Sequence, residues 1–161
     1  MENKTLNAPK YIDEIVSIIR SNLKKDELIE KLNDYHENDI AQSLEYLTKS
    51  ERLALYDVLG DEWVSEILAY VEEPQQFINE LDAKKLADII NEMDSDDAAD
   101  LLEKVDESVK EKIRPNLDED VKADIRLINS YDEDEIGSLI TTNYICISKT
   151  LDIRSAMHEL I

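Results

Sequence analysis

A short apolar pattern repeats along the middle of the chain and constrains the fold more than any other feature. Each copy starts at one residue and continues one, four and seven positions further on. This spacing lines one face of an α-helix of about two turns. A helix this short is not stable alone, so each unit must bury its apolar stripe against a neighbour. The copies start at Ile40, Val64, Leu86, Ala98 and Val121.

The breaks between copies carry helix-start chemistry. Ser50, Asp61 and Asp94 lie just before acidic first turns, where their oxygens can accept hydrogen bonds from free backbone N–H groups. Gly60 lies where a helix end would turn left-handed. Residues 10–130 are therefore predicted to be all-α, as a right-handed superhelical stack of short helices similar to HEAT and armadillo arrays.

The two ends of the chain differ from this middle part. Residues 1–9 are polar and predict a flexible tail, and residues 131–143 start with the acidic run YDEDE and predict a linker. Residues 144–161 predict one strand at Tyr144–Ile147 and one helix from Asp152 to Ile161. A single strand needs a sheet. We therefore expect the chain to stop just inside a second, α/β module.

The net charge bounds the class of partner. The 161 residues include 39 Asp and Glu against 18 Lys and Arg, which gives −21 at pH 7. Such a surface repels nucleic acid and anionic lipid, and it attracts cations or a basic protein face. The alternative is that most of the charge serves solubility. No run approaches the roughly 20 apolar residues that span a bilayer, and the one cysteine, Cys146, suits a reducing compartment.

No catalytic grouping is apparent, so the sequence predicts a binding or regulatory module and not an enzyme. His36 and His158 lie far apart, without a partner at nucleophile or zinc-site spacing. We expect His36 to start a helix and His158 to lie on the surface. Two isolated glycines cannot form a phosphate-binding loop. Core packing is expected for most of five aromatic residues, Tyr46, Tyr56, Trp63, Tyr70 and Phe77.

The acidic run at residues 94–100 has two readings. It is not an EF-hand, because Ala99 stands where glycine is needed and Val105 where the bidentate acid is needed. At a helix start, Asp96 and Asp100 share one face and Asp97 is turned off it. Such a pair suits a hydrated Mg²⁺, which keeps several waters and takes one or two carboxylates. The other reading is an acid cluster that only complements the helix dipole.

Several segments in order resemble the cytosolic amino-terminal part of MgtE-type magnesium channels over residues 30–161. They are HENDIA from His36, SEIL from Ser65, EMDSDDAADLL from Glu92 and YDEDEIGSLITTNY from Tyr131. The resemblance implies a superhelical N domain followed by the start of a CBS domain at residues 144–161. It also implies a transmembrane pore elsewhere in the full-length protein.

The resemblance further implies a role and a set of ligands. Mg²⁺ bound between the acidic N domain and the CBS domain would favour the closed pore. The matching positions are Glu66, Asp96, Asp100 and the backbone carbonyl of Gly137, and Ser138 departs from the family's second glycine. This piece alone should bind hydrated Mg²⁺ weakly, and other divalent cations are the alternative.

The same resemblance implies the partners. These are the CBS and pore domains of the same full-length chain, in a homodimer at the cytoplasmic face of the cell membrane, without nucleic acid. The fragment itself is expected to be soluble, and it would meet the membrane only through the missing transmembrane segments. The alternative function is a helical-repeat scaffold for protein partners, resembling the units of flagellar motor switch proteins.

Overall fold

The structure is a computed structural model that describes residues 9–21, 23–131, 147 and 149–159. Within these ranges the regular structure is helical and no strand occurs. The first helices are α1 (Lys10–Ile19), α2 (Lys25–Leu32), α3 (Glu37–Ser43), the 3₁₀ turn η2 (Leu44–Tyr46), α4 (Lys49–Leu59) and α5 (Asp61–Ala69). They are followed by α6 (Gln75–Ile78), α7 (Ala83–Asn91), α8 (Ser95–Glu103), α9 (Glu107–Ile113), η3 (Arg114–Asn116), α10 (Glu119–Ile128) and α11 (Ile153–Glu159).

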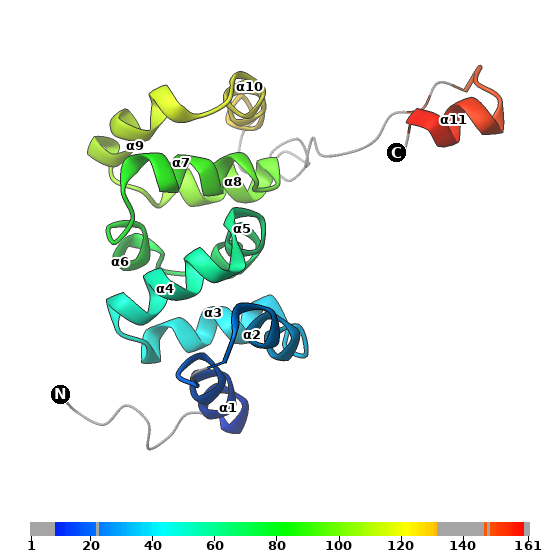
Figure 1. Ribbon diagram of the computed structural model, residues 1–161. Helices are drawn as coiled ribbons and strands as arrows, with labels where there is room; N and C mark the ends of the chain where they lie inside the picture. The colour runs from blue at the N-terminus through cyan, green and yellow to red at the C-terminus, as the bar shows by residue number, and fades with distance from the viewer. Residues whose placement is uncertain (1–8, 22, 132–146, 148, 160–161) are drawn as a thin grey trace.

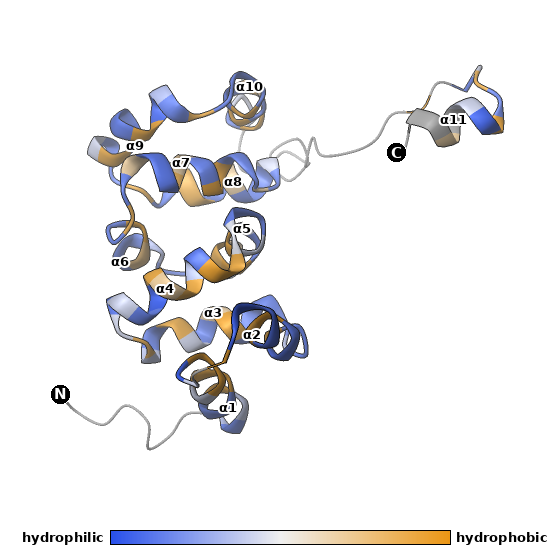
Figure 2. Cartoon of the chain, viewed as in Figure 1, coloured by the Kyte–Doolittle hydropathy of each residue, from blue (hydrophilic) through white to orange (hydrophobic). Residues whose placement is uncertain are grey.

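The helices from α1 to α10 form a stack, with α1 at one end and α9 and α10 at the other (Figure 1). Alternate helices contact each other in sequence: α1 packs on α3, α3 on α5, α5 on α7, and α7 on α9. The helix α8 packs against α5 and α10. Hydrophobic residues lie along helix faces that meet inside the stack (Figure 2). The prediction of an all-α array of short helices is thus confirmed for the described residues.

The repeated apolar pattern builds the core. The copies that start at Ile40, Val64 and Leu86 are buried at all four positions, including Ser65, which is 2% exposed. In the copy that starts at Ala98, the exception is Leu102, which is partly buried. Burying a large apolar side chain contributes about 1.5–3 kcal/mol, so the helices gain from neighbours what they lack alone.

The start of α3 lies where the sequence predicted it, and the start of α4 lies two residues earlier than predicted. His36 starts α3, and its Nδ1 accepts a hydrogen bond from the Asn38 N–H at 3.1 Å. Ser50 is not the cap of α4, because the helix begins earlier than the sequence indicated. Thr48 caps it, with its Oγ1 accepting from the Glu51 N–H and the Glu51 carboxylate accepting from the Thr48 N–H. This reciprocal pair satisfies two backbone donors at once.

Four of the five aromatic residues lie in or against the core, as expected for most of them, and one lies at the surface. Phe77 and Tyr56 are buried, and Tyr46 and Trp63 are partly buried against the core. Tyr70 is 50% exposed, because it follows α5 as the cap residue instead of lying on its inner face. Its ring contacts the His36 imidazole edge-on, with centroids 5.3 Å apart.

A buried arginine ties three elements together. The side chain of Arg52 on α4 donates to the backbone carbonyl of Leu44, at 2.8 Å, and to that of Leu47. Its Nε donates to the Glu80 carboxylate at 2.8 Å, and its guanidinium lies 5.2 Å from the Phe77 ring centre. The hydrogen bond to Glu80 raises the pKa of Arg52 above its ordinary value. The charge is therefore fixed in place inside the stack.

A second arginine pair lies at the surface and gives a pH-dependent prediction. Arg20 donates from Nε to Glu51 at 2.7 Å, and this bond lowers the pKa of Glu51 from 4.5 to about 2. A lowered carboxyl pKa contributes stability above pH 4.5 that is lost as the pH falls towards 2. Because the pair is partly exposed, we expect Glu51→Gln to cost about 0.5–1 kcal/mol at pH 7.

This cost should shrink to nothing as the pH falls through that window, as measured by urea unfolding at several pH values. Glu30→Gln, at an exposed position on α2, serves as the control and should change little at any pH. A cost for Glu51→Gln that stays constant from pH 7 to acid would contradict the linkage to Arg20.

Some predictions fall outside the described residues. These are the tail at residues 1–8, most of the linker at residues 131–143, the strand at Tyr144–Ile147 apart from its last residue, and Gly137. The His158 side chain is also outside the description. Among the described helices, none combines the length and apolar character needed to cross a membrane.

Candidate cation-binding site

Carboxylates from three helices line one hollow on the surface of the stack. Glu37, Glu66, Asp94 and Asp97 line it together with Tyr70, and its volume is about 440 Å³. We call this hollow, with its four carboxylates, the acidic groove. They come from the start of α3, the middle of α5 and the start of α8. An array of like charges at close range attracts a cation.

Local sequence and packing explain why these four side chains meet. Glu37 is the first residue of α3, directly after the His36 cap. Asp94 is the cap residue of α8, and Asp97 is the third residue of that helix. The helix α5, which carries Glu66, packs against both α3 and α8. Two helix starts and one helix face therefore converge on the same hollow.

The electrostatics of the groove oppose the ionised state of two of its carboxylates, Glu66 and Asp97. Burial raises the pKa of Glu66, and the charges of Glu37, Glu62 and Asp94 raise it further. Burial also raises the pKa of Asp97, followed by the charges of neighbouring aspartates, and Lys104 offsets part of this rise. A bound cation would relieve both effects, since it favours the charged form.

The raised pKa values also set the sign of the groove's own contribution to stability. A carboxyl whose folded pKa is raised binds protons more readily in the folded state. Its penalty is absent below the ordinary values of 3.8 for Asp97 and 4.5 for Glu66, and it grows as the pH rises through the folded values. At neutral pH Glu66 and Asp97 therefore destabilise the folded chain in the absence of a cation.

Two further hollows extend the acidic groove along α5. One of about 240 Å³ lies between Glu62, Glu66 and Glu92, and Ser65 forms part of its wall. The Ser65 hydroxyl donates to the backbone carbonyl of Glu62 at 2.6 Å and lies 3.3 Å from that of Glu92. The other, of about 580 Å³, reaches Asp61.

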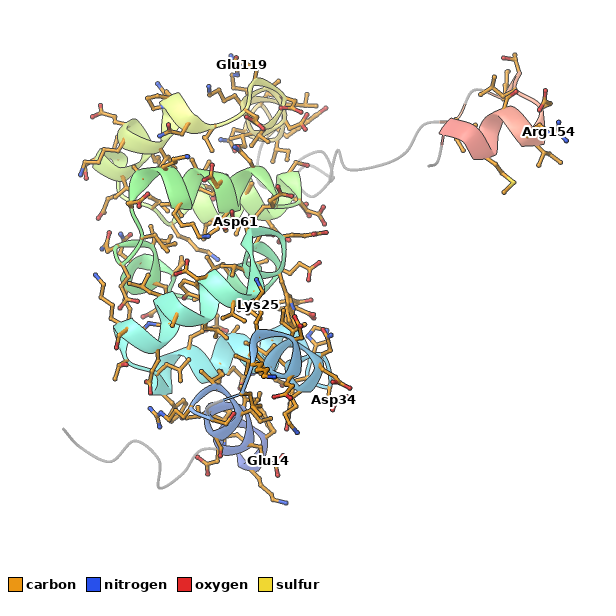
Figure 3. The ribbon with its side chains drawn as sticks, viewed as in Figure 1. Glu14, Lys25, Asp34, Asp61, Glu119 and Arg154 are labelled. Atoms are coloured by element: carbon orange, nitrogen blue, oxygen red, sulfur yellow. The ribbon has the colours of Figure 1, made fainter. Side chains whose placement is uncertain are left out.

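A lysine forms an ion pair with one of the acids that line these hollows. The Lys85 ammonium lies 2.7 Å from the Asp61 carboxylate, so this pair links α7 to α5. Figure 3 shows Asp61 in the middle part of the stack. Asp61 is thus neutralised from within the chain, whereas Glu66 is surrounded by like charges.

The structure places the predicted ligands differently with respect to the hollows. Glu66 lies in the acidic groove, but neither Asp96 nor Asp100 lines the three hollows described above. Asp96 is half-buried, and its Oδ1 is enclosed without a hydrogen-bond partner among the described residues. Asp100 is exposed, one turn further along α8. Their role as ligands, with that of Gly137, stays a prediction.

The donor set fits a hard, hydrated cation. Carboxylate oxygens are the ligands that Mg²⁺ prefers, and it typically takes one or two of them and keeps several waters. Within the described ranges, no group of three or more His, Cys, Asp or Glu side chains is placed to hold a metal ion.

Sequence reasoning missed three members of the acidic groove. Glu37, Asp94 and Asp97 each lie in or beside the first turn of a helix, where acids are expected for the helix dipole alone. These residues meet because α3 and α8 begin on the same side of α5. Predicting this requires knowing which helices pack together, and the spacing of residues within one helix does not give that.

Comparison with known proteins places the chain in a family. Residues 35–134 match the family described as the MgtE intracellular N domain. A solved structure, described as the soluble part of a magnesium transporter, superposes with a TM-score of 0.79 at 25% sequence identity. The superposition covers 93% of this chain and 60% of that one. No curated protein sequence matches. Because the family match spans most of the helical stack, the chain belongs to the family of the MgtE intracellular N domain.

Proposed function

We propose that this chain is the magnesium-sensing regulatory domain of a magnesium channel or transporter. The observation that carries the proposal is the acidic groove, where burial and neighbouring acids raise the pKa of Glu66. Family membership supports the link to magnesium, because the similar solved structure is the soluble part of a magnesium transporter. The proposed role is regulatory and not catalytic.

In the proposed mechanism the acids of α5 and α8 act as one charged surface. Glu66, Asp96 and Asp100, with the carbonyl of Gly137, would supply oxygen ligands, and the acidic groove would supply the surrounding field. A cation screens the repulsion between this surface and a CBS domain that closes against it, because screening lowers the energy of bringing like charges together. Closure would favour the closed pore, and loss of the cation would release the domain.

We also propose how the chain continues from the helical stack. Residues 144–161 would form the start of the CBS domain, and residues 10–130 would form a right-handed superhelix. The helix α11 supports this assignment, because Ile153 and Met157, four residues apart on it, are 82% and 59% exposed. An apolar pair at that spacing is typical of a face that packs against a further element. The proposed partners are the CBS and pore domains of a homodimer at the cytoplasmic face of the membrane.

The chain itself allows a direct test of the ligands. In about 10 mM MgCl₂ we expect a higher melting temperature than in NaCl of matched ionic strength. A ligand that binds only the folded state adds about 1.4 kcal/mol at ten times its Kd, a gain that thermal unfolding can resolve. Asp96→Asn/Asp100→Asn should remove most of this magnesium-specific gain.

The control is a second pair of aspartates in the same helical register. Asp120 and Asp124 on α10 occupy the second and sixth helical positions, as Asp96 and Asp100 do on α8. Asp120→Asn/Asp124→Asn removes the same charge from an equivalent part of a helix, and it should leave the magnesium-specific gain intact. If both pairs lose the gain equally, the effect is general screening. If Asp96→Asn/Asp100→Asn keeps all of it, those two residues are not ligands.

A further inference from the structure

The end of the stack opposite α1 carries a groove whose charge is opposite to that of the rest of the chain. Lys110 and Arg114 line it from α9 and η3, and Lys122 and Arg126 line it from α10. Its volume is about 550 Å³. We call these four side chains and the floor between them the basic groove. Figure 3 shows this end of the stack, where Glu119 is labelled.

The four cations form two pairs at helical spacing. Lys122 and Arg126 are four residues apart on α10, so their charges lie on one side of that helix. Lys110 near the end of α9 and Arg114 at the start of η3 are also four residues apart and line the same groove. Two acids also line the groove, Glu103 and Glu119. Glu119 pairs with Lys122 at 2.9 Å, and Glu107 lies 3.6 Å from Lys110. Among the ion pairs of the described residues, neither arginine takes part. Positive charge therefore exceeds negative charge locally, in a chain whose net charge is −21.

The arginine side chains retain donors that can bind a ligand. The Arg126 Nε donates to the Lys122 backbone carbonyl at 2.8 Å, which fixes the side chain along α10. Arg126 is exposed, and no hydrogen bond within the described part of the chain uses its terminal nitrogens. Arg114 is exposed. A guanidinium is a planar fork that binds phosphate oxygens in pairs, and it also stacks on flat rings.

The floor of the groove is apolar. It is formed by Leu102, Ile113, Leu117 and Ile125, which belong to the partly or fully buried core between α8, α9 and α10. A site with a few charged groups over an apolar floor is typical of small-molecule pockets, whose volumes run from about 300 to 1,000 Å³. The basic groove lies inside that range.

The surroundings favour a small ligand over an acidic protein segment. Exposed acids flank the groove in sequence at Glu107, Glu111, Asp118 and Asp120. An extended acidic chain would leave the groove and run over these like charges. A small anion stays within the groove, and at physiological salt charges beyond about 8 Å are largely screened. We propose that the basic groove binds a small organic phosphate, with its phosphate on the arginines and its apolar body on the floor.

This site is independent of the proposed magnesium site, so it is tested without Mg²⁺. The probe is phenyl phosphate, which combines both features, titrated into the chain and followed by amide NMR shifts. Inorganic phosphate, phenol and benzoate test the charge, the ring and a carboxylate in place of the phosphate. We expect saturable shifts on α9 and α10 with a Kd of about 1 mM or tighter for phenyl phosphate. Each of the other three probes should bind at least about tenfold more weakly.

Variants locate the binding to the arginines. Arg114→Gln/Arg126→Gln should weaken binding by about tenfold or more, which corresponds to the loss of charged hydrogen bonds. Arg114→Lys/Arg126→Lys keeps the charge but loses the fork, and it should give an intermediate loss. Lys49→Gln/Lys112→Gln removes the same charge at exposed positions outside the groove and should bind as the unchanged chain does. Circular dichroism confirms that each variant is folded.

Three outcomes of the titrations would overturn the proposal. They are the absence of saturable shifts, equal affinity for phenyl phosphate and inorganic phosphate, and unchanged binding by a folded Arg114→Gln/Arg126→Gln variant. Sedimentation of the same samples tests the other occupant. A dimer that this variant dissociates would assign the groove to contact between two copies of the chain, and it would also overturn the proposal.

Discussion

Arg52→Ala should lower the free energy of unfolding by about 3–5 kcal/mol, the loss expected when one partner of a buried ion pair is removed. Arg52 is 6% exposed, and the substitution leaves the Glu80 carboxylate without its partner. It also leaves the carbonyls of Leu44 and Leu47 without the donor they share. Urea unfolding followed by circular dichroism would measure the loss.

Two further variants separate burial from charge. Arg52→Leu/Glu80→Leu removes both charges and should recover part of the loss, because apolar replacements of a buried pair are often close to neutral. Arg20→Ala breaks the surface pair with Glu51 and should cost about 0.5–1 kcal/mol. Equal losses for Arg52→Ala and Arg20→Ala would show that the buried position adds nothing.

Gly60→Ala should cost about 1–3 kcal/mol, through the backbone alone. Gly60 ends α4 and starts α5 with φ 86° and ψ 168°, a region that residues with a side chain rarely adopt. A Cβ built at this position meets nothing within 4 Å, so steric contact with other residues adds no cost. Thermal and urea unfolding of the variant would measure the effect.

Gly60→Asn tests whether the turn can relax. Asparagine tolerates the left-handed helical region but not an extended ψ at positive φ, so it should cost about as much as alanine if the turn is rigid. A clearly smaller loss for asparagine would show that the turn moves into the left-handed helical region. A gain in stability for Gly60→Ala would contradict the assigned backbone conformation.

Helical periodicity was enough to predict the fold class of the described residues. The copies that start at Ile40, Val64 and Leu86 needed only local spacing, because each stripe must be buried whichever helix covers it. His36 as a helix start and Gly60 at positive φ were also predictable, because helix ends depend on the chemistry of a few neighbouring residues. The true cap of α4 was missed because Thr48 and Ser50 carry the same chemistry two residues apart.

The candidate site was less accessible from sequence. Glu66 was identified by resemblance, but its neighbours Glu37 and Asp97 come from helices that are distant in the chain. Arg52 gave no sequence signal, because a charged residue at an apparently outer helix position is normally solvated. Such contacts depend on which helix faces meet, and residue spacing within one helix does not determine that.

The central place of α5 in the stack has a mechanical consequence. This helix carries Glu66 and touches α3, α4, α7 and α8. A displacement of α5 is therefore shared at once by helices on both sides, since close-packed interiors transmit strain instead of absorbing it. A cation bound at Glu66 would restrain α5 and, through its contacts, the four helices packed on it. Its binding would then reduce the motion of the helices on both sides of α5, beyond the residues that contact the cation.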